Sequence, residues 1–292
     1  MRVALIAVPY DSGRRGERLG AGPEHLLDAG LARRLAAAGH EARVRTVEAP
    51  ADAWRAEIGT GFALARGVAS AVREAIADGA FPLVLSGNCG PAALGCIAGL
   101  GSAPAIFWFD AHGDFNTPET TVGGFLDGMA LATLTGRCWT QLAAGIPGFQ
   151  PVVESAVALI GARDLDPLEA AALAASRVRR VSVGEVRARL PAVLPAFEAS
   201  RPAYLHLDLD VLDPSEGRVN PYASPNGFRR ADVEWAITAI AGAVALRAAA
   251  LTAFDPGSDS GGRVCENALA LGTALIDAAR ASLTNAPRGL PI

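Results

Sequence analysis

The chain has 292 residues, of which 51% are hydrophobic and 6% aromatic, and its formal net charge is −4. This length is enough for a well-buried core without disulfides, and the slightly acidic charge gives no basis for binding nucleic acid or an anionic membrane. The N-terminal apolar run is too short for a signal peptide, and no run reaches the length of a membrane span. The four cysteines form no C-x-x-C pair, which indicates reduced thiols in a cytoplasmic protein.

Short apolar segments alternate with Ala-rich amphipathic segments along the chain. The apolar segments predict strands at 3–8, 42–47, 82–85, 105–109, 156–160, 178–183, 203–208 and 248–253. The intervening segments predict helices at 23–38, 61–78, 91–100, 126–134, 168–175, 185–198, 230–243 and 264–283. Pro191 and Pro195 should break or kink the sixth of these helices, because proline lacks the backbone N–H that a helix needs.

The alternation of strands and helices over the whole length predicts an α/β fold. We expect a three-layer α/β/α architecture, with a mostly parallel sheet of about eight strands, because such strands are apolar on both faces. No low-complexity linker interrupts the pattern, so one domain is expected over residues 1–292. An eight-stranded barrel is the competing architecture. Both architectures place a functional site at the carboxyl ends of the strands.

Two acidic clusters end two of the predicted strands. The first is Asp110-Ala111-His112-Gly113-Asp114 and the second is Asp208-Leu209-Asp210. Alternate residues of an extended chain share a face, so each cluster gathers its polar side chains on one side. Four buried carboxylates would repel each other without a cation, and five ligands exceed what one ion needs. The clusters therefore predict a site for two metal ions, and the long polar loops at 113–128 and 214–228 are candidate walls of a substrate pocket.

With these clusters, the chain resembles the arginase/agmatinase (ureohydrolase) superfamily over nearly its whole length. The combination of Asp-Ala-His-x-Asp with a later Asp-x-Asp-x-x-Asp-Pro motif is specific in this order. Further matching segments lie at 8–13, 21–23, 110–116, 161–167 and 248–255. Members of this family carry a binuclear manganese centre on an eight-stranded parallel sheet, where a bridging hydroxide attacks the guanidinium carbon of the substrate.

The resemblance implies a set of metal ligands by position. Asp110 and Asp208 would bridge the two ions. His112 and Asp210 would complete the shell of one ion, and Asp114 would belong to the other. A carboxylate-rich shell suits two divalent ions, with Mn²⁺ as the expected metal.

Cys89 departs from the family pattern, because it stands where these enzymes have a His ligand after the third strand. A thiolate can bind a divalent ion, and its softness shifts the preference away from manganese towards zinc or iron. The alternative is that Cys89 is a small buried residue and that one metal is weak or absent. Its place at a strand end beside the acidic clusters favours ligation.

Two acidic residues are candidates for catalysis. Asp127 stands where arginases have a His associated with proton transfer. A buried carboxyl at this position could protonate the leaving amine. The alternative is that Asp127 caps the following helix. Asp255 aligns without a gap on the Glu that holds the guanidinium in arginases, so it is expected to bind that group with a shorter arm. Its alternative is to start the turn before Pro256-Gly257.

Other residues favour an amino acid as the substrate. The segment 116–121, with Asn116 and Thr121, resembles the arginase loop that binds the α-carboxylate. Asp166 matches the residue that contacts the α-amino group, and it could also cap the helix that begins at Pro167. His206 faces the same way as Asp208, and is either a donor to a metal-bound carboxylate or a satisfied core histidine.

The resemblance implies an amidinohydrolase acting on a small guanidino amino acid. Cysteine in place of the His ligand is associated with the branch of Nω-hydroxy-L-arginine amidinohydrolases, so the first expected reaction converts that substrate to hydroxyurea and L-ornithine. L-Arginine, giving urea and L-ornithine, is the second. Formimidoylglutamate hydrolysis and a non-catalytic binding or regulatory homologue are the alternatives, and a single-zinc deacetylase is disfavoured because the chain has four His in total. Related enzymes imply a homo-oligomer, a trimer or hexamer.

Overall fold

The computed structural model describes residues 1–51, 56–199 and 201–285. Residues 286–292 of the domain predicted for 1–292 lie outside the described residues. An eight-stranded sheet has the order β4-β1-β5-β10-β9-β6-β7-β8, and all of its neighbouring pairs are parallel. Its strands are β1 (Arg2–Val8), β4 (Glu41–Thr46), β5 (Phe81–Ser86), β6 (Ala105–Phe109), β7 (Val157–Ile160), β8 (Arg179–Val181), β9 (Pro202–Asp208) and β10 (Ala245–Thr252).

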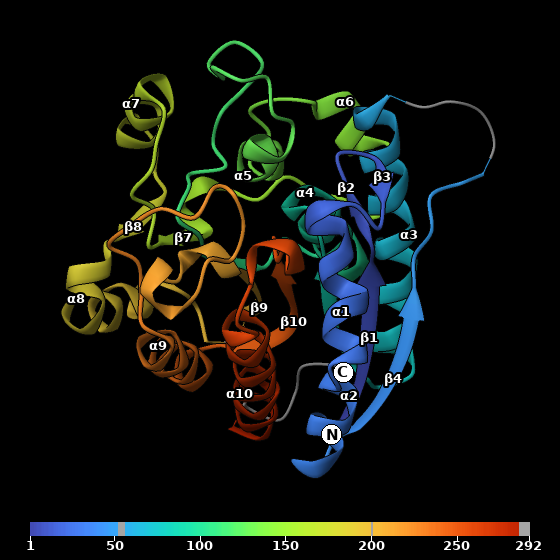
Figure 1. Cartoon of the computed structure of the whole chain (residues 1–292). Helices are drawn as coiled ribbons and strands as arrows, with labels where there is room; N and C mark the ends of the chain where they lie inside the picture. The colour runs from blue at the N-terminus through green and yellow to red at the C-terminus, as the bar shows by residue number, and fades with distance from the viewer. Residues whose placement is uncertain (52–55, 200, 286–292) are drawn as a thin grey trace.

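Helices cover both faces of this open sheet (Figure 1), which confirms the predicted three-layer α/β/α fold over the barrel. The helices are α1 (Gly22–Asp28), α2 (Leu31–Ala37), α3 (Glu57–Ala77), α4 (Cys89–Leu100), α5 (Ala130–Leu134), α6 (Thr140–Ala144), α7 (Pro167–Ala175), α8 (Val186–Val193), α9 (Arg230–Ala243) and α10 (Arg263–Asn285). Among the helices in the described part of the chain, none is both long and apolar enough to cross a lipid bilayer.

Two hydrophobic cores lie on the two faces of the sheet. One core joins the sheet to α1, α2, α8, α9 and α10, and the other joins it to α3, α4, α5 and α7. Successive strand residues point to opposite faces, so Leu5 of β1 packs in the first core and its neighbour Ile6 packs in the second. This explains why the inner strands of the sheet are largely apolar in the sequence, whereas the edge strands β4 and β8 carry charged, exposed residues.

Several elements differ from the sequence-based expectation. The helix predicted at 23–38 is two helices, α1 and α2, because Gly30 adopts a left-handed conformation with φ of +103° between them. Pro191 lies inside α8, which continues to Val193 before a 3₁₀ turn at Leu194–Ala196. The short helix α6 and a hairpin of β2 (Tyr10–Asp11) with β3 (Arg14–Arg15) were not predicted.

The four central strands of the sheet are β5, β10, β9 and β6. Because all of them are parallel, their carboxyl ends meet at one edge. Thr252 at the end of β10 is in register with Asp208 of β9 and with Ser86 of β5. The ends of these strands and the segments that follow them carry the sequence-predicted metal ligands, so the topology brings residues from distant parts of the chain together.

Candidate metal centre and substrate cavity

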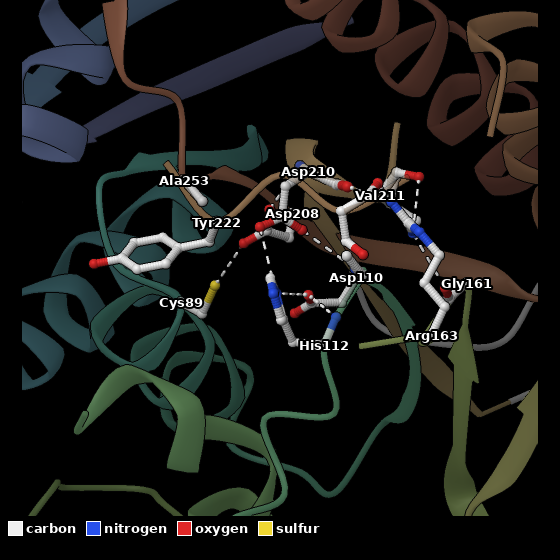
Figure 2. Close-up of polar contacts among 12 residues, drawn as sticks. Cys89, Asp110, His112, Gly161, Arg163, Asp208, Asp210, Val211, Tyr222 and Ala253 are labelled. Atoms are coloured by element: carbon white, nitrogen blue, oxygen red, sulfur yellow. Dashed lines mark hydrogen bonds and ion pairs between the residues drawn. The ribbon is translucent and has the colours of Figure 1, made fainter. Parts of the chain in front are cut away.

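Two groups of side chains at this edge of the sheet have the spacing of metal ligands. Cys89, Asp110 and Asp208 form one group, in which the ligand atoms lie within 4.8 Å of one another. Asp110, His112 and Asp210 form the other group, within the same limit. Figure 2 shows these side chains pointing toward one another. Asp110 belongs to both groups, which is the arrangement expected when a carboxylate serves two neighbouring ions.

Local backbone geometry holds the carboxylates in place. Asp110 directly follows β6, and its Oδ1 atom accepts a hydrogen bond from the His112 backbone N–H at 2.7 Å. The Asp208 Oδ1 atom accepts from the Asp210 backbone N–H at 2.8 Å, where a 3₁₀ turn follows β9. The Ala111 backbone N–H donates to Asp210 Oδ1 at 3.2 Å and links the two clusters. Each carboxylate thus keeps other lone pairs free for a metal.

The charges in this cluster are not balanced by protein groups alone. Burial, together with the charges of Asp210 and Asp110, raises the pKa of Asp208 well above its usual value. Burial alone would lower the pKa of His112, but the negative charges of Asp210 and Asp110 have the larger effect and raise it. Burial alone would raise the pKa of Asp210, but the contact with His112 lowers it to about 2. The His112 Nδ1 atom lies 3.3 Å from Asp110 Oδ1 and 3.4 Å from Asp210 Oδ2.

Asp114 provides an independent test of whether these residues suit metal ions. Its Oδ2 atom is buried and has no hydrogen-bond partner among the described residues, and its backbone has a strained φ of +48°. Burial and the charges of Asp110 and Asp127 raise its pKa well above the usual value. A buried carboxylate without a partner is costly, and a cation relieves both the missing contact and the repulsion. The residues present therefore fit a carboxylate-rich divalent metal site.

Cys89 lies in this site as its position in the sequence predicted. Its Sγ atom is 3.2 Å from Asp208 Oδ2 and 3.3 Å from Thr252 Oγ1. Burial, with the charges of Asp127 and Asp208, raises the pKa of the thiol well above its usual value. Since a thiolate is the form that binds a metal, ligation by Cys89 requires a cation to displace the proton.

Asp127 is buried and borders the same cavity, but it does not cap the helix that follows it. Its carboxylate accepts hydrogen bonds from the N–H groups of Cys89 and Gly90, both at 2.8 Å, and from Asn88 Nδ2 at 3.0 Å. These three donors belong to the start of α4, so Asp127 caps that helix from a distant segment. Burial nevertheless raises the pKa of Asp127 to about 7.

The Asp255 carboxylate makes its contacts within its own turn. Its carboxylate accepts from the Gly257 N–H and from the Ser258 hydroxyl, both at 2.9 Å, and so starts the 3₁₀ turn Pro256–Ser258. Ala253 is the residue of this segment that borders the cavity, with a left-handed φ of +63°. The geometry therefore supports the turn alternative for Asp255, and its side chain is not among those that border the cavity.

A single cavity of about 290 Å³ connects the metal groups to the predicted amino-acid site. Asn116, Thr121 and Asp166 border it together with the metal ligands. The Asn116 Nδ2 atom donates to Asp166 Oδ2 at 3.0 Å, so these two side chains form one polar patch. Asp166 also starts α7, where Glu169 accepts from the Asp166 backbone N–H at 3.3 Å. Both roles considered for Asp166 are compatible with this geometry.

Some residues that shape the site carried no role in the sequence analysis. Asn220 donates through Nδ2 to Asp210 Oδ2 at 3.3 Å and to the Ala253 carbonyl at 2.9 Å. Its Oδ1 atom accepts from the Tyr222 N–H at 2.9 Å. Tyr222 borders the cavity and packs beside Phe125 with ring centroids 5.7 Å apart. Asn220 and Tyr222 lie in the loop 214–228 and Phe125 lies in the loop 113–128, the two loops that were predicted as pocket walls.

Arg163 supports the loop that carries Asp210 (Figure 2). Its guanidinium donates to six backbone carbonyl oxygens at 2.8–3.3 Å, which belong to Gly161, Asp210, Val211, Leu212, Ser224 and Pro225. An arginine has five N–H donors in a fixed planar fork, so one terminal N–H is shared between two of the six acceptors. The side chain therefore joins the segment after β7 to the segment after β9.

Comparisons with known proteins identify the family of this chain. The Arginase family model matches residues 1–278. An arginase of Bacillus caldovelox is 30% identical over 244 residues, which cover 73% of this chain and 77% of that protein. An N(omega)-hydroxy-L-arginine amidinohydrolase of Streptomyces lavendulae is 38% identical over 135 residues, 46% of each chain. The solved arginase of Bacillus cereus superimposes with a TM-score of 0.85 at 26% identity, and covers 94% of this chain and 98% of that one.

These matches confirm the resemblance stated from the motifs. The arginases are enzymes that act on small guanidino compounds, and the cavity described above contains two groups of side chains that could hold metal ions. The chain therefore belongs to the arginase family and is an amidinohydrolase, a hydrolase that cleaves C–N bonds of linear amidines.

Proposed function

We propose that this enzyme hydrolyses the guanidino group of an α-amino acid, with Nω-hydroxy-L-arginine as its preferred substrate and L-arginine as the second. The products would be hydroxyurea or urea, and L-ornithine. One observation carries the proposal: a single cavity joins the metal groups to Asn116, Thr121 and Asp166, and its wall after β10 is Ala253. Similarity to the Streptomyces lavendulae amidinohydrolase supports the same choice.

The wall formed by Ala253 indicates which head group the substrate carries. A guanidinium is a permanent cation, and burying it needs an anionic partner. At the wall after β10, Ala253 offers no carboxylate, and Asp255 has its carboxylate in the next turn. An N-hydroxyguanidine is less basic, because its electronegative oxygen withdraws electron density, and so it loses less on entering this cavity. Tyr222 adds an aromatic surface on which a planar head group can pack.

The other end of the cavity suits the zwitterion of an amino acid. Asn116 and Thr121 offer donors for a carboxylate, and Asp166 offers an acceptor for an ammonium group. Among the described residues that border the cavity there is no arginine, so a second carboxylate has no cationic partner. This argues against formimidoylglutamate as the substrate.

We propose two divalent ions as the cofactor, with Mn²⁺ first because four of the candidate ligands are carboxylates. When bound, the ions would supply Lewis acidity and a nucleophilic water near neutral pH. The ligands would be Cys89, Asp110, His112, Asp114, Asp208 and Asp210. Cys89 makes zinc or iron the alternatives to test.

Asp127 is the proposed proton donor for the leaving amine. It borders the cavity, and burial raises its pKa to about 7, so the carboxyl carries a proton over part of the neutral range. The oxygen atoms also accept hydrogen bonds from the start of α4, so Asp127 would combine a structural and a catalytic role.

We also expect a single-domain cytoplasmic enzyme that assembles as a trimer or hexamer. The four cysteines are free and buried, which is consistent with a reducing compartment. Oligomeric state rests on the resemblance alone, and sedimentation of the purified protein would test it.

The decisive experiment measures metal content and turnover together. The metal-free protein is reloaded with Mn²⁺, Zn²⁺ or Fe²⁺ and assayed with Nω-hydroxy-L-arginine, L-arginine and agmatine, for the wild type and for Cys89→His. Two metals per chain, release of hydroxyurea and no cleavage of agmatine would support the proposal. Preference for L-arginine would make it an arginase with a variant ligand. One metal or none, with no substrate cleaved, would favour a binding protein and overturn the proposal.

A further inference from the structure

A buried chain of hydrogen bonds runs from Cys89 into the sheet, away from the substrate cavity. The Cys89 Sγ atom lies 3.3 Å from Thr252 Oγ1, and Thr252 Oγ1 lies 3.2 Å from His206 Nε2. On the other side of the imidazole, His206 Nδ1 lies 2.8 Å from the Tyr204 hydroxyl. All four side chains are at most 2% exposed, so water cannot compete for these contacts.

The imidazole of His206 is fixed by packing as well as by hydrogen bonds. It stacks on the Trp108 ring with a centroid distance of 3.7 Å and an angle of 10° between the planes. Trp108 Nε1 in turn donates to Asp110 Oδ2 at 3.0 Å, and Asp110 is the carboxylate shared by both metal groups. His206 therefore packs against residues that touch the ligands of both groups, although it is not itself a ligand.

The hydrogen bonds can run in two directions, because an imidazole has two tautomers. In the first, Tyr204 donates to Nδ1, Nε2–H donates to Thr252, and the Thr252 hydroxyl donates onward. In the second, every bond is reversed, and the Tyr204 hydroxyl hydrogen has no acceptor within the described residues. A buried hydroxyl without an acceptor is unfavourable, so the structure favours the first direction.

We infer that His206 is a positioning residue for the metal site: held between Tyr204 and Thr252, it turns the Thr252 hydroxyl hydrogen towards the Cys89 sulfur. This inference rests on the proposed function, because it takes Cys89 as a metal ligand. A metal-bound thiolate has no hydrogen of its own and accepts hydrogen bonds. The chain of donors is already oriented to meet that acceptor. The reverse direction would turn the Thr252 hydroxyl hydrogen towards His206 and leave the sulfur without this donor.

Thr252 has one other acceptor in reach, Asp208 Oδ2 at 3.5 Å. That oxygen is 3.2 Å from the Cys89 sulfur and receives the thiol hydrogen while the thiol is protonated. The shorter distance from Thr252 is the one to sulfur, at 3.3 Å. A spectrum can distinguish a Thr252 hydrogen bond to the sulfur from one to Asp208. Only a hydrogen bond to the sulfur changes the energy of the electronic transition between the sulfur and a bound metal.

The experiment uses the full-length protein loaded with Co²⁺, without substrate. A thiolate ligand gives a sulfur-to-cobalt charge-transfer band in the near ultraviolet, and a hydrogen bond to the sulfur moves this band to shorter wavelength. Cys89→Ser should abolish the band. Cys96→Ala should leave it unchanged, because Cys96 is a buried cysteine of the same helix that no metal group includes.

Thr252→Val keeps the shape of the side chain and removes the hydroxyl. We expect the band to move to longer wavelength and Co²⁺ affinity to fall roughly 10–100-fold, the usual effect of losing a partner of a ligand. Thr252→Ser should restore both. His206→Leu should move the band in the same direction as Thr252→Val, and His206→Gln, whose amide can donate to Thr252, should recover part of the change.

A band at the same wavelength in the wild type, Thr252→Val and His206→Leu would overturn the inference, and so would the absence of a band that depends on Cys89. If His206→Leu does not fold, Tyr204→Phe makes the same test, because it removes the donor that selects the tautomer. Turnover of Nω-hydroxy-L-arginine with Mn²⁺ is measured separately. An unchanged band in an active enzyme refutes only the positioning role, whereas a sensitive band in a protein that cleaves neither substrate refutes only the proposed function.

Discussion

The Asp127 carboxylate accepts a hydrogen bond from the Cys89 backbone N–H at 2.8 Å, which ties a loop after β6 to the first turn of α4. The residue expected to move a proton thus also holds the backbone of a candidate metal ligand. A change at Asp127 should therefore alter both the stability of the fold and the rate of the reaction, and these two effects can be separated.

Asp127→Asn should lower the free energy of unfolding by about 1–2 kcal/mol, because the amide has one acceptor oxygen for three donors that now bind a carboxylate. It should also lower kcat about 100-fold or more, since an amide cannot deliver a proton. Urea denaturation and steady-state kinetics measure the two effects. Asp78→Asn, at an exposed site after α3, is the control and should change stability by less than about 0.5 kcal/mol. An unchanged kcat would show that Asp127 transfers no proton.

The metal-free protein should become less stable as the pH rises. Burial raises the pKa of Asp127 to about 7, and raises those of Asp114 and Asp208 as well. Between about pH 4 and pH 7 the folded state therefore holds protons that the unfolded chain has lost, so the free energy of unfolding falls with pH. Asp210, with a pKa of about 2, works in the opposite sense only below this range.

The measurement is the thermal midpoint in the presence of a chelator at pH 5 and pH 8, repeated with saturating Mn²⁺. We expect the midpoint to fall between the two pH values without metal, and the difference to shrink with metal, since a cation replaces the protons. A metal-free protein that is more stable at pH 8 than at pH 5 would contradict the assignment of these carboxyls as a repulsive cluster.

Arg163→Lys should destabilise the loop that carries Asp210. A lysine has three donors on one nitrogen and cannot reach carbonyls that a planar guanidinium bridges. We expect a loss of about 2 kcal/mol or more, because buried carbonyls are left without donors, together with weaker Mn²⁺ binding. Arg180→Lys, at an exposed site of β8, is the matched control. Equal stability of the two variants in denaturation experiments would refute this structural role.

The strands and the metal groups were predictable because their signals are local. A buried parallel strand is a short apolar run, and the acidic clusters stand out in the sequence because they lie at the ends of two such runs. The expected extended geometry was wrong for the first cluster, because the chain bends after β6 and Asp114 has a φ of +48°. The eight predicted strands correspond to β1 and β4–β10. The break at Gly30 was less visible, because a single glycine inside a periodic pattern does not reveal its left-handed conformation.

The roles of Asp255, Asn220 and His206 depend on where the chain leaves a strand. Counting residues places Asp255 at the substrate, but Ala253 takes a left-handed φ directly after β10, and Asp255 starts the next turn. Asn220 contacts Asp210 across a loop, which no sequence spacing specifies. The sequence predicted that His206 faces the same way as Asp208. Its contacts with Thr252 and Trp108 could not be predicted, because these residues belong to neighbouring strands.

Ala253→Glu tests which residue sets the head-group preference. The new carboxylate would lie at the cavity wall, where it can pair with a guanidinium, and the backbone strain at φ of +63° is similar for alanine and glutamate. A hydrogen bond to a charged group contributes about 1.5–3 kcal/mol, so the kcat/KM ratio of L-arginine to Nω-hydroxy-L-arginine should rise roughly tenfold or more. Asp255→Asn should leave the ratio unchanged and only weaken the turn at Pro256–Ser258. If instead Asp255→Asn alters the ratio and Ala253→Glu does not, Asp255 reaches the substrate during turnover and the wall at Ala253 does not select it.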